Sequence, residues 1–372
     1  MDISQINRIL NLAIAIQQIP APTFSERQRA NFVFQCFQKE LLSDVQIDLL
    51  GNVYGCLPGA GSGKPLVVTA HTDTVFPAST DLKIRRDSEN VSGPGIGDNS
   101  LGVAGLFGLV WALRQKSLSQ KQSALSGDLW LVANVGEEGL GNLRGMKAVV
   151  ERFGKEARAY LVLEGMSLGQ IYHRGLAVKR YRIAVNTPGG HSWVDHGRPS
   201  AIHVLAQLVT RITSLPHPGN PRTTLNVGVI QGGTSVNTIA AQASLELDLR
   251  SESVQELEAL VNQVERLVRE TNQKDVRATA EMIGWRPAGG IASDHPLVKL
   301  AAQILMMQGL KPRFNIGSTD ANIPLSLGLP CICLGLTSGS GAHTTEEQIH
   351  TMPISQGMEQ IVQVVERVYA SL

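Results

Sequence analysis

The stretch Leu129-Trp-Leu-Val-Ala-Asn-Val-Gly-Glu-Glu-Gly139 is an apolar run that ends in two adjacent carboxylates. Short, continuous apolar runs are typical of strands in a parallel sheet that is covered on both faces. Open sheets of this kind place their sites beyond the carboxyl ends of the strands, which is where Glu137 and Glu138 fall. Two side-by-side carboxylates are costly unless a cation shares them, so the stretch predicts both a fold class and a site.

Similar runs recur along the chain and alternate with helical patterns. Pro65–Ala70, Ala159–Glu164 and Pro330–Leu334 are expected to be further buried strands, and Gly102–Leu113 a buried helix of small residues. Strands that alternate with helices imply an α/β domain with a mostly parallel sheet. Near the start of the chain, Thr23-x-x-Glu26 resembles a capping box that opens a helix through about residue 42.

The segment 176–283 has a different pattern. It begins with an alternating strand and continues as helix, strand, strand, helix and strand, at 200–215, 224–230, 243–249, 254–270 and 276–283. This β-α-β-β-α-β order matches a ferredoxin-like α+β unit of small-domain size. We therefore expect residues 1–175 and 284–372 to form one domain, into which 176–283 is inserted.

The bulk composition argues against several classes of partner. The chain has 372 residues, 33 basic and 32 acidic, with a net charge of +1, so neither nucleic acid nor a membrane is an expected partner. The amino-terminal residues do not resemble a signal peptide, and no segment approaches the ~20 apolar residues of a membrane span. The four cysteines form no Cys-x-x-Cys motif, so a reducing, cytoplasmic location is expected.

Imidazoles and carboxylates lie at or just after the ends of other expected strands. The groups are His71, Asp73, Asp98, Glu164 and His343. Nitrogen and oxygen donors without thiolates are the ligands of a catalytic zinc or similar divalent centre. Together with the two adjacent glutamates, they predict a two-metal hydrolase.

Strand geometry suggests roles for the neighbouring groups. Residues i and i+2 of a strand face the same way, so His71 can bind metal while Asp73 fixes its tautomer. Adjacent residues face opposite ways, so Glu138 can bind metal while Glu137 faces a water as general base.

Each group also has a plainer interpretation. Asp98 could cap the following helix, and Glu137 and Glu138 could form a solvated acidic loop. Glu164 could simply end a strand, and His343 could be a surface histidine. A phosphate loop around Asp98 is rejected, because the spacing is not Gly-x-Gly-x-x-Gly and no P-loop lysine follows. The joint pattern favours a single site.

These motifs resemble the M20 metallopeptidase and deacylase family, which includes acetylornithine deacetylase, succinyl-diaminopimelate desuccinylase, aminoacylase, tripeptidase T and glutamate carboxypeptidase. The resemblance covers essentially the whole chain. It rests on His71-Thr-Asp-Thr-Val, Gly-Ile-Gly-Asp98-Asn, Gly-Glu137-Glu138-Gly, Leu-Glu164-Gly, Gly-Gly-His191-Ser, Val-Asn237-Thr-Ile, Leu-Asp-Leu-Arg250 and Ala-His343-Thr-Thr-Glu346-Glu347. It implies a zinc-exopeptidase-like catalytic domain with an inserted ferredoxin-like lid and dimerisation domain.

The resemblance implies two divalent metal ions, zinc or else cobalt or manganese, that share Asp98. His71 and Glu164 would complete one site, and Glu138 and His343 the other. The peptide bond after Asp98 is expected to be cis. Many relatives carry an acidic residue in the next position, where this chain has Asn99; that position is not a ligand, so we expect tuning rather than loss.

The resemblance also implies substrate-binding residues. His191 would supply an oxyanion donor from the lid of a partner subunit, and Arg250 would clamp a substrate carboxylate. Asn237 and Thr319 would contact the substrate. For Arg250, the plainer interpretation is a surface salt bridge with Asp248 or another nearby acid.

We therefore expect a homodimeric hydrolase that cleaves an amide bond in a short peptide or an N-acyl amino acid. An exopeptidase is slightly favoured over a dedicated deacetylase. The alternative is a non-catalytic member that keeps the fold as a binding or assembly module. Such a protein should have lost the base or a ligand, whereas this chain keeps Glu137 and all five proposed ligands.

Overall fold

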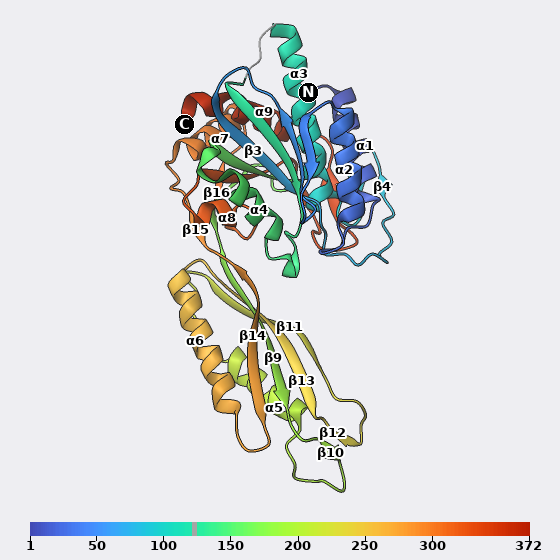
Figure 1. The fold of residues 1–372 in the computed structure, drawn as a ribbon, viewed down its shortest axis with the longest axis vertical. Coiled ribbons are helices and arrows are strands. Elements are labelled where there is room, and N and C mark those ends of the chain that lie inside the picture. The colour runs from blue at the N-terminus through green and yellow to red at the C-terminus, as the bar shows by residue number, and fades with distance from the viewer. Residues whose placement is uncertain (121–124) are drawn as a thin grey trace. The chain divides into compact units, whose positions relative to one another are not determined.

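The computed structural model describes residues 1–120 and 125–372, which divide into two compact units (Figure 1). Unit 1 comprises Met1–Gly175 and Gly289–Leu372, and unit 2 is Leu176–Ala288. Unit 2 extends past the boundary predicted at residue 283, because its last strand, β14 (Arg277–Arg286), continues beyond that point.

Within the described residues, unit 1 is built on a nine-stranded sheet in the order β1-β2-β6-β3-β7-β17-β8-β15, with β16 paired to β8. Its four central strands, β6, β3, β7 and β17, are parallel, which confirms the predicted α/β class. The strands are β1 (Ser43–Ile47), β2 (Val53–Leu57), β3 (Gly63–His71), β6 (Gly127–Asn134), β7 (Ala159–Glu164), β8 (Gln170–Gly175), β15 (Gly289–Gly290), β16 (Arg313–Gly317) and β17 (Cys331–Gly335).

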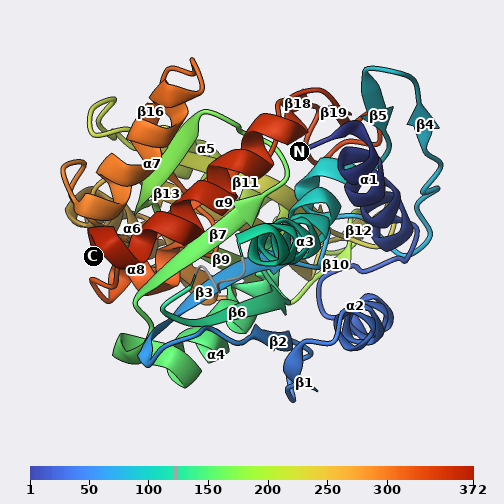
Figure 2. The ribbon, with the colours of Figure 1, turned by 90° about the horizontal axis from the view of Figure 1, so that it is seen from above.

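Helices cover both faces of this sheet, and Figure 2 shows α3 and α9 on one side and α4 on the other. Along β3, Leu66 and Val68 enter the core on one face and Val67 enters the core on the other. This period-2 burial is what a doubly covered strand requires. The helices are α1 (Ile3–Gln17), α2 (Arg27–Lys39), α3 (Gly102–Gln120), α4 (Arg144–Phe153), α7 (Pro296–Met307), α8 (Asn322–Ser326) and α9 (Ile354–Ser371).

The expected buried helix is longer than predicted. Together, a π-helical turn, η1 (Ile96–Leu101), and most of α3 form a 23-residue helical stretch, Ile96–Leu118, that by length and composition alone could cross a membrane. The stretch includes Asp98, Arg114 and Lys116, so it is not an unbroken run of ~20 apolar residues. Since 89% of the apolar window is buried inside the protein, the stretch has the environment of a core helix.

The predicted capping box at Thr23 and Glu26 was also wrong. Glu26 is itself the N-cap of α2 and makes no side-chain cap bond, while the Thr23 hydroxyl donates to Asp73 Oδ2 at 2.9 Å. The Glu26 carboxylate accepts from Arg144 at 2.9 Å. Thr23 therefore bonds a tertiary partner, and the Glu26 carboxylate is shared between Arg144 and the nearby Phe24 N–H, at 3.0 Å.

Unit 2 has the predicted β-α-β-β-α-β order. Its strands β9 (Ala177–Asn186), β11 (Thr223–Gly232), β13 (Gln242–Ser251) and β14 form an antiparallel sheet in the order β11-β13-β9-β14. The helices α5 (Ala201–Thr213) and α6 (Val254–Thr271) cover one face, where Leu245, Leu247 and Leu249 of β13 are buried. A small ribbon of β10 (Gly190–His191) and β12 (Thr238–Ile239) completes the unit.

A further small sheet in unit 1 connects two loops that matter for the site. Its strands are β4 (Arg85–Arg86), β5 (Asn90–Ser92), β18 (Gly339–Ser340) and β19 (Gln348–His350), in the order β18-β19-β5-β4. The chain leaves β5 towards Asp98, and the loop between β18 and β19 carries His343. Pairing of β19 with β5 therefore brings these two loops together.

Candidate metal centre

The site forms where neighbouring strands of unit 1 end. His71 is the last residue of β3, Glu164 is the last residue of β7, and Glu137 and Glu138 follow β6. β3 lies between β6 and β7 and is parallel to both, so the three carboxyl ends meet at one edge. This is the edge at which open α/β sheets bind ligands.

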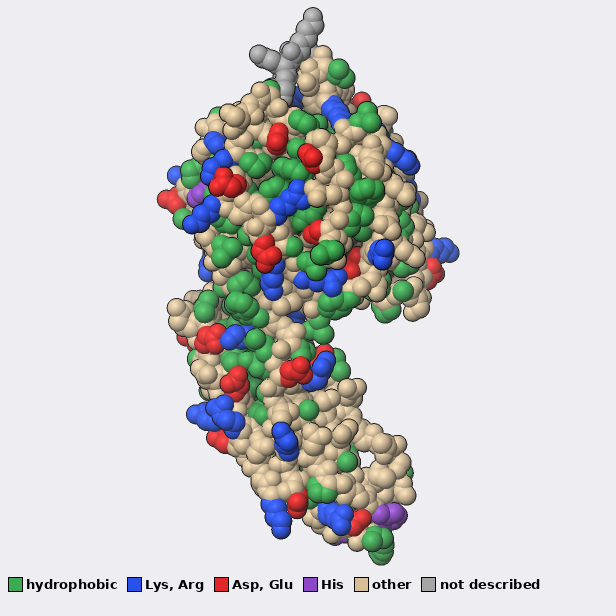
Figure 3. Space-filling view, viewed as in Figure 1, with side chains coloured by type: hydrophobic (Ala, Val, Ile, Leu, Met, Phe, Trp, Pro, Cys, Tyr) green, Lys and Arg blue, Asp and Glu red, His purple; other side chains and the backbone are tan. Residues whose placement is uncertain are grey.

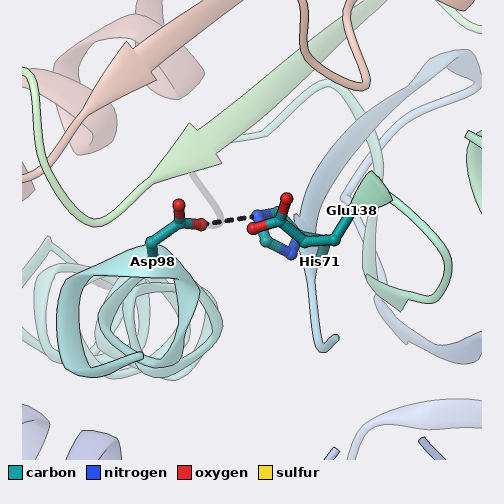
Figure 4. A group of neighbouring side chains, drawn as sticks. All are labelled: His71, Asp98 and Glu138. Carbon is teal, nitrogen blue, oxygen red and sulfur yellow. Dashed lines mark ion pairs between the residues drawn. The ribbon is translucent and has the colours of Figure 1, made fainter. Parts of the chain in front are cut away.

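Asp98 lies at the centre of the cluster and contacts two histidines with its two oxygens. Its Oδ1 lies 3.1 Å from His71 Nε2, and its Oδ2 lies 3.1 Å from His343 Nε2. Figure 4 shows Asp98, at the end of its helix, pointing towards His71 and Glu138. The carboxylate therefore has one oxygen for each imidazole.

Each histidine also lies near a second carboxylate. His71 Nε2 is 3.7 Å from Glu164 Oε2, and His343 Nε2 is 3.2 Å from Glu138 Oε1. By these contacts His71 and Glu164 lie on one side of Asp98, and His343 and Glu138 lie on the other. Ligand atoms of His71, Asp98 and Glu138 all lie within 4.8 Å of one another.

The donor set fits divalent metal ions. Two donors around one tetrahedral zinc at ordinary bond lengths are separated by about 3.3 Å, close to most of the distances seen here. In the described part of the chain, the ion pairs of Asp98, Glu138 and Glu164 are all with histidines and none is with lysine or arginine. Carboxylates gathered without such a partner suit a bound cation.

Several pKa values in the cluster are shifted, because its side chains are buried and lie close together. Burial raises the pKa of Glu138 and of Glu164 to about 7, and neighbouring carboxylates add to the rise. Hydrogen bonds to Asp98 and Glu138 raise the pKa of His343 to about 10. In the absence of a cation, protons therefore reduce the negative charge of the cluster. Metal ions would compete with these protons for the same nitrogen and oxygen atoms.

Asp73 positions His71, Glu137 and Glu138 through its backbone carbonyl and its carboxylate. It is fully buried, and its backbone carbonyl lies 3.0 Å from His71 Nδ1, so Nε2 is left facing the cluster. Its carboxylate accepts the backbone N–H groups of Glu137 at 3.0 Å and of Glu138 at 2.9 Å. One buried side chain thereby fixes the backbone under both glutamates as well as the histidine ring.

The Asp98 turn is held by Glu347, a buried residue that follows His343 in the same loop. Its Oε1 accepts the N–H groups of Gly97 at 2.5 Å and of Asp98 at 2.7 Å. The turn departs from helical geometry at Asp98 itself, with φ −108° and ψ 90°. The Asp98–Asn99 peptide bond is cis, as the resemblance implied.

Asn99 joins this turn to the strand that carries Glu164. Its Nδ2 donates to the Leu163 carbonyl at 2.8 Å, and its Oδ1 accepts the Gly165 N–H at 2.9 Å. The buried Asn99 side-chain amide therefore hydrogen-bonds to the backbone on both sides of Glu164. An ionised aspartate could accept from Gly165 but could not donate to Leu163.

Asp320 is a further buried acid, and it interacts electrostatically with Glu137, the candidate general base. Asp320 is fully buried, its Oδ2 accepts from Asn134 Nδ2 at 2.7 Å, and its Oδ1 has no hydrogen-bond partner among the described residues. Burial, and next the negative charge of Glu137, raise the pKa of Asp320 to about 8. Asn134, which ends β6 opposite His71, links this acid to the strand edge.

His191 and Asn237 belong to unit 2, where they lie on paired segments. The backbone N–H of Ser192 donates to the Asn237 carbonyl at 3.0 Å. His191 is exposed, and its Nδ1 accepts the N–H groups of Trp193 at 3.2 Å and Val194 at 3.4 Å. In the neutral ring the proton is therefore on Nε2, which is free to donate.

Arg250 and Thr319 have partners close by. Arg250 Nε donates to Asp248 Oδ1 at 2.6 Å, so the salt bridge considered as the plainer interpretation is present. Asp248 also pairs with Arg180 at 2.8 Å, which leaves two guanidinium groups for one carboxylate. The Thr319 hydroxyl accepts the Ala321 N–H at 3.2 Å within its own loop. Their substrate contacts stay predictions.

Sequence reasoning assigned no supporting role to Glu347 or Asp320. Glu347 is the last residue of the His343 motif quoted above, and Asp320 follows Thr319. The available signal was an acidic residue within or beside one of these motifs. Burial of that acid, which decides its role, depends on the tertiary packing.

Two family models match consecutive parts of the chain. The model described as "Peptidase family M28" matches residues 52–173, and "Peptidase dimerisation domain", the M20 dimerisation model, matches 172–276. The first match falls within unit 1, and the second falls almost wholly within unit 2. The division between the two models therefore lies at the first boundary between the units.

Curated relatives match over most of their length. A [LysW]-lysine/[LysW]-ornithine hydrolase from Saccharolobus solfataricus is 21% identical over 97% of this chain and 96% of that protein. An acetylornithine deacetylase from Erwinia tasmaniensis is 27% identical over 84% of this chain and 83% of that protein.

Solved structures share the fold. The aminopeptidase PepT from Bacillus cereus matches with a TM-score of 0.75 and 22% identity, over 98% of this chain and 99% of that chain. A Bacillus subtilis protein described as a dinuclear metal binding peptidase matches with a TM-score of 0.69 and 15% identity, over 100% of both chains. At these identities the likeness establishes the fold.

Proposed function

The chain belongs to the M20 group of metallopeptidases and deacylases and is a hydrolase, and on this premise we propose that it cleaves amide bonds with two divalent metal ions held around Asp98. The substrate would be a short peptide or an N-acyl amino acid. The observation that carries the proposal is the division of the ligands by Asp98, with one oxygen towards His71 and the other towards His343.

We assign one ion to His71, Asp98 and Glu164 and the other to Asp98, Glu138 and His343. Zinc is our first choice, because the donors are imidazole nitrogens and carboxylate oxygens, although cobalt and manganese accept the same ligands. Bound metal ions of this kind polarise a scissile carbonyl and lower the pKa of a water molecule.

Glu137 is our candidate for the general base. It neighbours Glu138, and its backbone is fixed by Asp73, so its carboxylate is held at the edge of the cluster. In this role Glu137 takes a proton from the attacking water and later delivers it to the leaving amine. No ligand is lost from the site, which argues against the alternative of a non-catalytic binding module.

The test separates catalysis from metal binding. Wild type, Glu137→Gln and the exposed control Glu151→Gln would be assayed on di- and tripeptides and N-acyl amino acids, with bound metal measured in parallel. We expect Glu137→Gln to keep its metal and to lose about 10²–10⁴-fold in turnover, the usual contribution of a general base. Unchanged turnover in Glu137→Gln would contradict the assignment.

The same substrates distinguish an exopeptidase from a deacylase. The relatives include a deacetylase and the similar structures include an aminopeptidase, so names alone do not decide. Of the two, we favour the exopeptidase. Faster cleavage of free dipeptides than of the matching N-acyl amino acids would support it, and the opposite order would assign a deacylase.

We further propose a homodimer formed through unit 2. Support comes from the dimerisation-domain match and from β11, an edge strand on which the consecutive residues Val229 and Ile230 are 48% and 60% exposed. Consecutive strand residues face opposite sides, so this edge is apolar on both faces. Exposed apolar strand edges are suited to pairing with another chain.

In such a dimer His191 would donate its Nε2 proton to the oxyanion in the partner's site. Co-expression of His191→Ala with Glu137→Ala tests this arrangement. If His191 acts between subunits, mixed dimers contain one complete site and regain activity that neither variant has alone. No recovery in mixed dimers would place His191 and Glu137 of one site in the same chain.

A further inference from the structure

A second feature of unit 1 is a cavity of about 570 Å³ beside the metal centre. Three chain segments line it: 166–170, which follows Glu164; 338–342, which ends one residue before His343; and a segment around Lys311 and Arg313 at the start of β16. Its volume lies within the range of small-molecule sites. Two of its three walls are therefore continuous with proposed metal ligands.

The Met166 side chain lines the cavity and also contacts the Asp98 turn. A Cβ added at Gly97, next to Asp98, would lie 2.8 Å from Met166 Cγ, and one added at Gly339 would lie 2.6 Å from Met166 Sδ. Both glycines are thus in close contact with this side chain. A group bound in the cavity would lie one side chain away from the turn that holds Asp98.

The charge of the cavity is one-sided. Among the described residues that line it, Lys311 and Arg313 are the ionised side chains, and no aspartate or glutamate is present. Within the described residues, neither cation forms an ion pair. On the face drawn in Figure 3, by contrast, basic and acidic side chains are interspersed.

The remaining lining suits a short, polar-ended group. Met166, Leu168 and Leu310 supply apolar surface, while Ser167, Ser338 and Ser340 supply hydroxyl groups. Serine hydroxyls can donate to an anion, and an unpaired guanidinium can grip a carboxylate with two parallel bonds. An aliphatic chain that ends in a carboxylate would contact both the apolar lining and the hydrogen-bond donors.

We propose that this cavity is a specificity site for an acidic side chain, so that the enzyme prefers substrates with a glutamate or aspartate next to the cleaved bond. This inference rests on the proposed function and narrows its substrate class. Lys311 and Arg313 bind the side-chain carboxylate and take no part in the chemistry.

The experiment uses matched dipeptides that differ only in charge, Glu-Ala against Gln-Ala and Ala-Glu against Ala-Gln. Turnover would be measured for metal-loaded wild type, Lys311→Met, Arg313→Met, the double variant and Lys299→Met, an exposed lysine of α7 that serves as control. Dissociation constants for the same peptides would be measured by calorimetry in the metal-loaded Glu137→Ala background, so that the test does not depend on turnover.

We expect wild type to favour the glutamate peptide over its glutamine match by about tenfold or more in one of the two positions, as a charge-assisted bond provides. The double variant should lose that preference by weakening the glutamate peptide alone, and Lys299→Met should keep it. Equal binding of both matched peptides at both positions, or a preference that survives in the double variant, would overturn the inference.

Two further outcomes are distinguishable. Binding that discriminates glutamate without any turnover would contradict the proposed function and still support the cavity assignment. A cavity for a free anion would instead bind inorganic phosphate in a Lys311- and Arg313-dependent way and treat matched peptides alike. That result would overturn the assignment to substrate.

Discussion

A carboxylate can serve two cations only if its two oxygens are presented to different sides, and Asp98 is held so that they are. Glu347 binds the N–H groups of Gly97 and Asp98, and Asn99 ties the next residue to the strand of Glu164. Groups behind the ligands orient them and tune the affinity of the site. The orientation of the Asp98 carboxylate therefore depends on side chains that are not themselves proposed ligands.

The first residue-scale prediction concerns Asn99. Its replacement by alanine leaves the Leu163 carbonyl and the Gly165 N–H without their buried partners, so we expect metal affinity to fall about 10–100-fold. Asn99→Asp keeps the acceptor and should lose less. Metal dissociation constants of both variants, compared with Asn11→Ala on the exposed face of α1, check this. Unchanged affinity in Asn99→Ala would contradict it.

The second residue-scale prediction concerns pH. In the metal-free protein the pKa values of Glu138 and Glu164 are raised to about 7, and that of His343 to about 10. A raised pKa contributes stability that is present below the unfolded value and is lost as pH rises through the folded value. The metal-free protein should therefore become less stable between about pH 5 and 10.

Metal ions replace those protons, so their stabilising effect should grow as pH rises through the same range. The measurement is the melting temperature with zinc and with chelator, from pH 5.5 to pH 9. We expect the difference between the two curves to widen with pH. A difference that narrows towards high pH would show that the cluster is not the metal site.

Much of the candidate site could be predicted from the sequence at this scale. His71, Glu138 and Glu164 could be placed because each follows an apolar strand, and strand ends meet in space. The roles of Asp320 and Glu347 could not, because burial makes an acid structural or reactive and burial is set by chain segments far away. For Arg250, the sequence offered the salt bridge with Asp248 only as an alternative to substrate binding, and the structure contains that salt bridge.

At the scale of elements, the position of Glu137 and Glu138 depends on how β6 meets α4. The Gly145 N–H donates to the Val135 carbonyl at 3.0 Å, and Asn52 bonds both Val135 and Gly145. A Cβ at Gly145 would lie 2.2 Å from the Val135 carbonyl oxygen. The helix can approach the strand end this closely only because that residue is glycine.

Gly145→Ala should therefore be destabilising, by about 1–3 kcal/mol, as overpacking usually is. Helix propensity alone would predict a gain of up to about 1 kcal/mol, so the two effects have opposite signs. We also expect reduced turnover, because Val135 lies two residues before Glu137. Denaturant unfolding and activity, with Glu151→Ala on the same helix as control, check both. A stabilised, active variant would contradict this account.

The elements themselves were predictable where the pattern was strong. The central strands β3, β6, β7 and β17 are short apolar runs, a pattern typical of buried parallel strands. The capping-box prediction was wrong because the Thr23 hydroxyl bonds Asp73, a partner distant in the sequence, and Glu26 bonds Arg144 and the Phe24 N–H. β8 and β16 were missed because both mix polar and apolar residues and gain their stability by pairing with each other.

At the scale of the whole molecule, the proposed dimer depends on the apolar edge of β11. Val229→Lys places a charge on that edge, and the two-fold symmetry of a dimer would bring its copy nearby. We expect a shift from dimer to monomer by light scattering. Val254→Lys, at a 46% exposed valine of α6, is the matched control. Dimers that persist in Val229→Lys would show that the interface lies elsewhere.

The central claim, that the chain holds two metal ions which share Asp98, is tested most directly by counting metal per chain. Metal content would be measured by elemental analysis after equilibrium dialysis against zinc, for wild type, Glu164→Ala and Asp98→Ala. We expect two ions in wild type, one in Glu164→Ala and none retained tightly in Asp98→Ala. A wild-type chain that binds no metal, or an Asp98→Ala variant that still holds two ions, would contradict the account.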